Sequence, residues 1–353
     1  MRIVAALGGN ALLRRGERPD AGIQLGHVRT AARALGPLAA RHELVICHGN
    51  GPQIGMLSLE SESDPALSRP YPLDALVAQT QGMIGYWLTQ CLGNDGLAKP
   101  VLSLVTQTLV DPGDPAFAEP TKFVGPVYDH RRARQLADLH GWTIAADGDR
   151  WRRVVPSPEP QRIIEQDSIT HLLDTGSVVI CGGGGGAPVA DDGSGRLHGV
   201  EAVVDKDSTA ALLATTLHAD RLLVLTDVPA VMAHFGTPQA TALRHLDLDD
   251  LAGMEFPAGS MGPKIAACRH FVAATGHPAA IGQLPDASAI LAGAAGTTIT
   301  TAHAHEPGSR PRRQQPGEGG SSPDGRPNTG PSRTHDLSTG GTRPRPTDGS
   351  PEP

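Results

Sequence analysis

The feature that most constrains the fold is a short, wholly apolar segment, residues 3–7, that runs directly into a pair of glycines. A segment without polar alternation is typical of a strand buried on both faces of a parallel sheet. Gly8 and Gly9 allow a sharp turn and a close approach of the backbone to a ligand, and Asn10 adds an amide that can donate to an anion. This pattern is typical of a phosphate-facing strand end in an α/β fold, with an ordinary turn as the alternative.

Two later segments repeat this arrangement. Residues 44–47 are wholly apolar and run into the sequence His-Gly-Asn-Gly at 48–51, and residues 178–181 run into five glycines at 182–186. Matching strand ends predict one shared site at the carboxyl edge of a sheet. Five successive glycines carry a high entropy cost, and close approach of the backbone to phosphate explains them better than a flexible linker does.

Two lysines lie at the starts of predicted helices. Lys206 lies between Asp205 and Asp207, just before a helix expected at about 208–217, and Lys264 follows a pair of glycines at the start of another. The carboxylates can fix the position of the Lys206 ammonium and keep it protonated, and a helix N-terminus favours anions. Both segments predict anion binding, with a solvated charged turn as the alternative around Lys206.

The rest of the body alternates between predicted helices and strands. The expected elements are helices near 23–40, 73–92 and 161–173 and strands at 101–110 and 222–225. The last of these strands ends in Thr226 and Asp227, at a position where such folds often place nucleotide contacts.

Two regions depart from this alternation. Repeated prolines between residues 111 and 160 predict a small insertion that could act as a lid. Lys122 in this insertion is either a cationic residue of the site or an ordinary surface charge. Residues 303–353 have almost no apolar side chains among many Pro, Gly, Ser and Arg, which predicts a disordered tail. The folded body is therefore predicted to cover residues 1–302.

Several classes of protein are disfavoured. A net charge of −7 gives no reason to expect nucleic-acid binding, and no apolar run approaches the length of a membrane span. The chain begins without the pattern of a signal peptide, and its four cysteines are scattered without a C-x-x-C pair. We therefore expect a cytoplasmic protein with reduced thiols. A P-loop motif is absent from the sequence.

Together these segments resemble the carbamate kinases of the amino-acid kinase family. The matching segments, in the order of the family across residues 2–301, are ALGGNALL, HGNGPQIG, PLDALVAQTQGMIGYWL, TQTLVDPGDPAF, PTKFVGP, WRRVVPSPEP, CGGGGG, GVEAVVDKD, LTDV and FPAGSMGPKI. The joint occurrence of PTK, WRRVVPSP, DKD and SMGPK makes the resemblance specific. The glycine run is one residue longer than the family pattern, and the tail from residue 303 has no counterpart in it.

The resemblance implies an open three-layer αβα sandwich around a mainly parallel sheet, with residues 161–302 on the nucleotide side, and usually a homodimer. It implies reversible phosphoryl transfer between carbamoyl phosphate and ADP, giving ATP and carbamate. Mg²⁺ would be carried on the nucleotide phosphates and not in a dedicated protein cage. Such enzymes often serve arginine metabolism, at the ATP-yielding end of the arginine deiminase pathway.

The resemblance also implies roles for individual residues. The lysines around the transferred phosphoryl group would be Lys122, Lys206 and Lys264, with Asp205 and Asp207 orienting Lys206. Carbamate and phosphate would be bound by Gly8, Gly9, Asn10, Gly49, Asn50 and Gly51. The nucleotide side would comprise Gly182, Gly183, Gly184, Asp205, Thr226 and Asp227.

Carbamate is already an anion, so its attack on phosphorus requires no proton to be removed. We therefore predict catalysis by positioning and charge stabilisation, with His48 as an orienting or core residue and not a general base. Two alternatives remain open. One is another amino-acid kinase with a different acceptor, such as acetylglutamate, aspartate or a nucleoside monophosphate; the other is a non-catalytic nucleotide-binding regulator.

Overall fold

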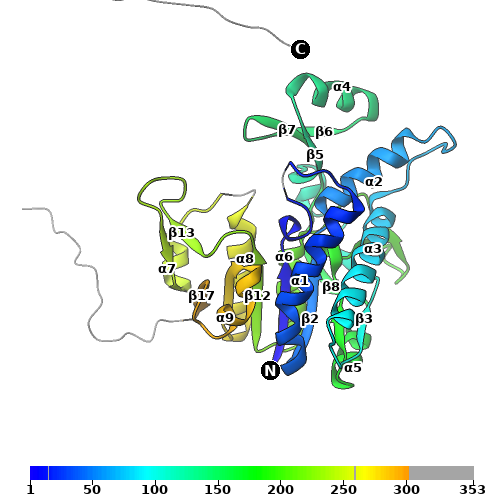
Figure 1. Cartoon of the computed structure of the whole chain (residues 1–353). Helices are drawn as coiled ribbons and strands as arrows, with labels where there is room; N and C mark the ends of the chain where they lie inside the picture. The colour runs from blue at the N-terminus through cyan, green and yellow to red at the C-terminus, as the bar shows by residue number, and fades with distance from the viewer. Residues whose placement is uncertain (15, 258–259, 302–353) are drawn as a thin grey trace, which may run out of the picture. The chain divides into compact units, whose positions relative to one another are not determined.

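The predicted αβα sandwich is confirmed by a computed structural model, which describes residues 1–14, 16–257 and 260–301. Its centre is an eight-stranded sheet with helices on both faces (Figure 1). In spatial order the strands are β15 (His245–Asp247), β17 (Thr297–Thr300), β16 (Ala279–Gln283), β12 (Arg221–Thr226), β1 (Arg2–Leu7), β2 (Glu43–His48), β9 (Val178–Ile180) and β3 (Val101–Ser103). β16 and β17 pair antiparallel, and the other neighbours pair parallel. The tail predicted at 303–353 lies outside the described residues.

Successive residues of the central strands point to opposite faces of the sheet, and each face is covered by helices. Ile3, Ala5 and Leu7 pack with one set of helices, whereas Val4 and Ala6 pack with the other. The first set is α1 (Ala21–Arg41), α3 (Leu73–Asn94) and α9 (Ala287–Leu291), and the second is α5 (Gln166–Asp174), α6 (Lys206–Thr216), α7 (Leu248–Ala252) and α8 (Met261–Thr275). Burial on both faces explains why these strands lack polar alternation.

The prediction of a single strand at 101–110 is wrong, because this segment forms two strands in different sheets. β3 ends at Ser103, and β4 (Gln107–Val110) joins a second sheet of order β11-β10-β4-β8. Between them, the backbone N–H and the hydroxyl of Thr106 each donate to Gln81 Oε1 at 3.0 Å, and Gln81 Nε2 donates to the Thr106 carbonyl at 3.1 Å. These bonds to α3 replace the hydrogen bonds of a continuous strand.

The helix predicted at 161–173 begins later than expected. Its first residues form β8 (Pro160–Ile163), which pairs antiparallel with β4, and α5 then begins at Gln166. The second sheet is completed by the hairpin of β10 (Ala187–Asp191) and β11 (Leu197–Gly199), and a separate hairpin joins β13 (Val231–Ala233) to β14 (Thr241–Leu243). Among the described residues, no helix combines the length and the apolarity that a membrane span requires.

Within the predicted insertion, residues 122–155 form a separate antiparallel sheet that we call the lid. Its strands, in the spatial order β5-β7-β6, are β5 (Lys122–Tyr128), β7 (Arg150–Val155) and β6 (Thr143–Asp147), joined by helix α4 (His130–His140). Figure 1 shows the lid beside α2 (Gly51–Ser63), and the two touch closely. A Cβ on Gly55 would lie 1.8 Å from Cα of Gly125, so both positions require glycine for β5 to cross α2.

Candidate active site

The ends of β1, β2 and β12 lie side by side at the carboxyl edge of the main sheet. Leu7 pairs with His48 on one side and with Leu225 on the other. A Cβ on Gly49 would lie 2.8 Å from the backbone nitrogen of Gly9, so the two glycine loops touch and tolerate no side chain there. The sequence prediction that these loops meet is therefore correct.

The remaining residues of this edge follow directly from the strand ends. Gly8 donates its N–H to the Leu225 carbonyl at 2.8 Å, and Thr226 lies against it at the end of β12. Asn10 lies in a 3₁₀ turn, Gly9–Ala11, and Asn50 is the residue directly before Gly51, the first residue of α2.

The glycine run after β9 packs against these same loops. A Cβ on Gly183 would lie 2.3 Å from Nε2 of His48, and a Cβ on Gly184 would lie 1.9 Å from Nδ2 of Asn50. All five glycines, 182–186, are buried. The fold therefore requires glycine here for packing within the protein, a reason that could not be predicted from the sequence. The approach of these glycines to phosphate stays a prediction.

The start of α6 carries two aspartates, of which one caps the helix and the other binds two ammonium groups. Asp205 is the N-cap, and its carboxylate accepts from the backbone N–H of Asp207 at 2.8 Å and of Ser208 at 3.3 Å. Asp207, 3% exposed, accepts from the ammonium of Lys206 and, at 3.1 Å, from that of Lys264 on α8. One buried carboxylate thus joins two ammonium groups.

The third predicted lysine reaches the same helix start from the lid. Lys122, the first residue of β5, forms an ion pair with Asp205. The three lysines therefore converge on two neighbouring aspartates, although they come from the lid, α6 and α8. The three predicted lysines thus lie close together, and their role around a phosphoryl group stays a prediction.

Burial and the ion pairs shift the pKa values of these groups. Burial raises the pKa of Asp205, but the Lys122 and Lys206 ammonium groups outweigh it and hold that pKa well below its usual value. Burial also lowers the pKa of Lys206, with Lys264 adding to the effect and Asp207 opposing it. At Lys264, burial is outweighed by Asp207 and the pKa is raised.

The comparisons with known proteins agree with this geometry. Residues 1–283 match the profile described as the amino acid kinase family. The chain belongs to the amino acid kinase family. Carbamate kinase of Rhizobium meliloti (strain 1021) is 50% identical over 304 residues, which cover 85% of this chain and 94% of that protein. Carbamate kinase of Escherichia coli (strain K12) is 48% identical over 298 residues, which cover 84% and 99%.

A solved structure of the same family has a similar fold. It is the carbamate kinase of Giardia lamblia bound to AMP-PNP, which superposes with a TM-score of 0.76 at 38% identity and covers 85% of this chain and 98% of that one.

In this amino acid kinase, His48 lies in the core beneath the glycine loops. It is 1% exposed, and burial lowers its pKa to about 4, with the Gly49 carbonyl opposing the shift. Its Nδ1 lies 3.1 Å from that carbonyl oxygen, so the neutral ring donates from Nδ1. Such a residue is placed to orient the loop, in agreement with the sequence prediction.

The predicted nucleotide contacts at the end of β12 lie near the lysines of this amino acid kinase. Thr226 donates its hydroxyl to the carboxylate of Asp227 at 3.1 Å, and Gln283 donates to the Asp227 carbonyl at 3.1 Å. The Asp227 carboxylate contributes to raising the pKa of Lys264. Thr226 and Asp227 therefore share the edge at which the glycine loops end.

A magnesium ion prefers oxygen ligands, and the carboxylates at the start of α6 are already engaged by lysines. Within the described part of the chain, no cluster of three or more His, Cys, Asp or Glu side chains is placed to hold a metal.

Proposed function

We propose that the protein is a carbamate kinase, which transfers a phosphoryl group reversibly between carbamoyl phosphate and ADP and gives ATP and carbamate. The observation that carries the proposal is the convergence of three lysines on Asp205 and Asp207 at the start of α6. Relatives named carbamate kinase match most of this chain, and at 50% and 48% identity they support the same activity.

In this proposal Lys122, Lys206 and Lys264 neutralise charge on the oxygens of the migrating phosphoryl group. A carbamate oxygen forms a bond to the γ-phosphorus of ATP while the bond to the ADP oxygen breaks, and no proton is transferred. The lysines would exchange part of their contact with Asp205 and Asp207 for the phosphoryl oxygens. Charge stabilisation by preorganised donors of this kind is often the largest part of catalysis.

The loops at the strand ends would bind the reacting groups. Gly8, Gly9, Asn10, Gly49, Asn50 and Gly51 would hold carbamate and phosphate, because backbone N–H groups and helix N-termini favour anions. Gly182, Gly183, Gly184, Asp205, Thr226 and Asp227 would form the nucleotide side. Mg²⁺ carried on the nucleotide phosphates would supply further charge neutralisation when bound.

We further propose a cytoplasmic homodimer that serves arginine metabolism. The pathway rests on the family resemblance, and the cytoplasmic location on the scattered free thiols. Dimerisation is supported by the outer strand β3, where Leu102 is exposed, and by Val105, which follows this strand and is also exposed. Light scattering on a Leu102→Asp, Val105→Asp variant should show a monomer, and an unchanged dimer would place the interface elsewhere.

The test of the activity is direct. Purified protein with Mg²⁺, ADP and carbamoyl phosphate should form ATP, while assays with acetylglutamate, aspartate or a nucleoside monophosphate as acceptors of phosphate from ATP should show far lower turnover. Preferred turnover of one of these acceptors would assign another amino-acid kinase activity. Nucleotide binding without transfer to any acceptor would favour the regulator.

A further inference from the structure

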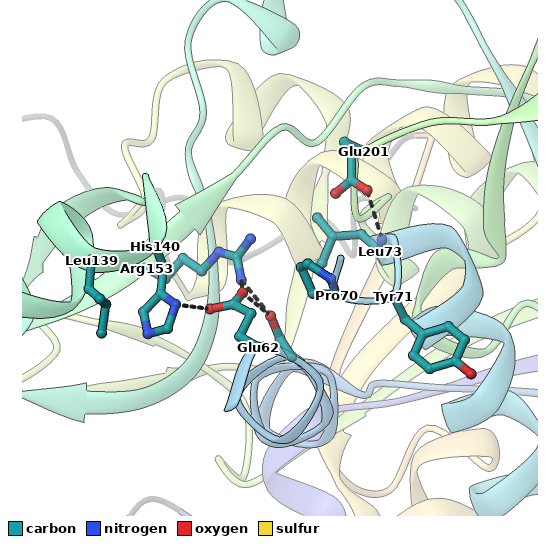
Figure 2. A pocket seen from close by; sticks show the side chains of 9 residues that line it. Glu62, Pro70, Tyr71, Leu73, Leu139, His140, Arg153 and Glu201 are labelled. Atoms are coloured by element: carbon teal, nitrogen blue, oxygen red, sulfur yellow. Dashed lines mark hydrogen bonds and ion pairs between the residues drawn. The ribbon is translucent and has the colours of Figure 1, made fainter. Parts of the chain in front are cut away.

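One carboxylate on α2 receives hydrogen bonds and an ion pair from three parts of the lid. Glu62 Oε1 accepts from Arg153 Nη1 of β7 at 2.9 Å and from Trp142 Nε1 at 3.1 Å, and Oε2 lies 3.0 Å from Nδ1 of His140, the last residue of α4. Figure 2 shows the Glu62 carboxylate between His140 and Arg153. Glu62 therefore contacts the helix, the strand and the connection that make up this end of the lid.

The cluster is stiffened by contacts among its members. Ser58 lies one turn before Glu62 on the same face of α2, donates to its carboxylate at 2.9 Å, and accepts from Arg153 at 2.5 Å. The Arg153 guanidinium lies over the Trp142 ring at 4.9 Å, and the His140 ring stacks on the same ring at 5.1 Å. A change at Glu62 would therefore alter the contacts of every lid side chain in the cluster.

The sheet of the lid connects this cluster to the predicted catalytic lysine. Arg153 pairs with Val124, and Val155, two residues further along β7, pairs with Lys122. Lys122 in turn forms its ion pair with Asp205 at the start of α6. A displacement of β7 at Arg153 would thus move the strand that positions the Lys122 ammonium.

The helix that carries Glu62 also begins at the candidate site. α2 starts at Gly51, directly after the glycine loop of β2, and its 13 residues end one position beyond Glu62. A cavity of about 390 Å³ lies beside Glu62, between the lid and the segment 70–73 that leads into α3. This cavity leaves the lid room to shift when its contact with α2 is broken.

We propose that Glu62 is a positioning residue that anchors the lid to α2 and so keeps Lys122 over the N-terminus of α6. This inference rests on the proposed carbamate kinase activity. Burial of Arg153 supports it, because burial lowers the pKa of that guanidinium while Glu62, together with Glu201, opposes the shift, so the Glu62 carboxylate helps to stabilise the buried charge.

The test is a double-mutant cycle between Glu62 and Lys122. Glu62→Gln keeps the shape and an acceptor oxygen but removes the charge, and we expect a loss of about 10–10²-fold in kcat, because small misplacements of a catalytic group have effects of this size. In a Lys122→Met background the same change should cost less than about threefold, because its effect passes through Lys122. Equal losses in the two backgrounds would overturn the anchor role.

Glu60→Gln is the matched control, because Glu60 lies on the same helix, carries the same charge and is exposed. It should leave kcat unchanged, and a loss equal to that of Glu62→Gln would show a general effect of charge on α2. If Glu62→Gln does not fold, Trp142→Phe removes one donor and keeps the ion pairs. Its smaller loss should likewise vanish in the Lys122→Met background, and persistence of the loss would overturn the proposal.

Amide hydrogen exchange measures how firmly the lid is held and does not depend on turnover. It therefore distinguishes failure of the anchor proposal from failure of the proposed function. Glu62→Gln should accelerate exchange of amides in the lid and leave those of α1 unchanged, and unaltered exchange in the lid would overturn the anchor role. Absence of wild-type turnover with carbamoyl phosphate and ADP would instead refute the proposed function, whatever the lid does.

Discussion

The two halves of the candidate site are held in place by different forces. On the body, Lys206 and Asp207 are 7% and 3% exposed and lie at the start of a helix packed against the main sheet. On the lid, the side chain of Lys122 is 28% exposed and belongs to a small antiparallel sheet joined to α2 by the cluster around Glu62. The body half is preorganised by the main core, whereas the lid half is held by a smaller apolar cluster shared with α2 and α3 and by the polar contacts around Glu62.

This comparison predicts the largest effect for a lysine of the body. Lys206→Met should lower kcat by about 10²–10³-fold, the size of losing one preorganised donor, and Lys122→Met should fall at the lower end of that range. Steady-state kinetics with carbamoyl phosphate and ADP measure both. A larger loss for Lys122→Met than for Lys206→Met would reverse the order that burial implies.

A glycine of the body should be less replaceable than a glycine of the lid. Gly49→Ala would place a Cβ 2.8 Å from the Gly9 backbone, and the required shift should cost about 1–3 kcal/mol of stability and reduce activity. Gly148 in the β6–β7 turn has φ +68 but open space around it, so Gly148→Ala should cost about 1 kcal/mol and spare activity. Denaturant unfolding and kinetics test the pair, and equal losses of activity would contradict the contrast.

His48 predicts a pH dependence of stability for the body. Its pKa is about 4 in the folded state and ordinary, near 6.5, in the unfolded state, so the unfolded chain binds more protons between these values. The free energy of unfolding should therefore fall as pH decreases from about 6.5 to 4, by on the order of 1 kcal/mol per pH unit. Denaturant unfolding of His48→Gln at pH 7 and 5 should show a weaker dependence.

His48→Gln also tests the mechanism. If catalysis needs no general base, the variant should retain turnover at neutral pH once it is folded. Abolished turnover in a variant of normal stability would show that the reaction requires a base after all.

The smallest effect is expected from the C-terminal segment. Its composition is that of a chain unable to bury enough apolar surface to fold, so removal of residues 303–353 should leave kcat and Tm nearly unchanged. A large loss of either quantity would show that residues 303–353 contribute to activity or stability beside the body and the lid.

Local pattern was sufficient for the scaffold of the body. Wholly apolar segments such as 3–7 and 44–47 predicted buried parallel strands, and their glycine ends predicted a shared edge, because a buried strand imposes its composition residue by residue. The pattern failed at Thr106, where the strand ends because Gln81 of α3 satisfies its backbone groups. Hydrogen bonds to a residue 25 positions away leave no local signal.

The sequence by itself predicted the buried strands, the helices between them and the glycine turns at the strand ends, because burial acts on each residue where it stands. The family resemblance implied the αβα sandwich and the three lysines. Only the tertiary structure decided which groups meet. It paired Lys122 with Asp205, joined Lys206 and Lys264 through Asp207, and gathered three side chains of the lid around Glu62. Contacts between separate segments depend on how the chain packs, and that packing is a property of the whole fold.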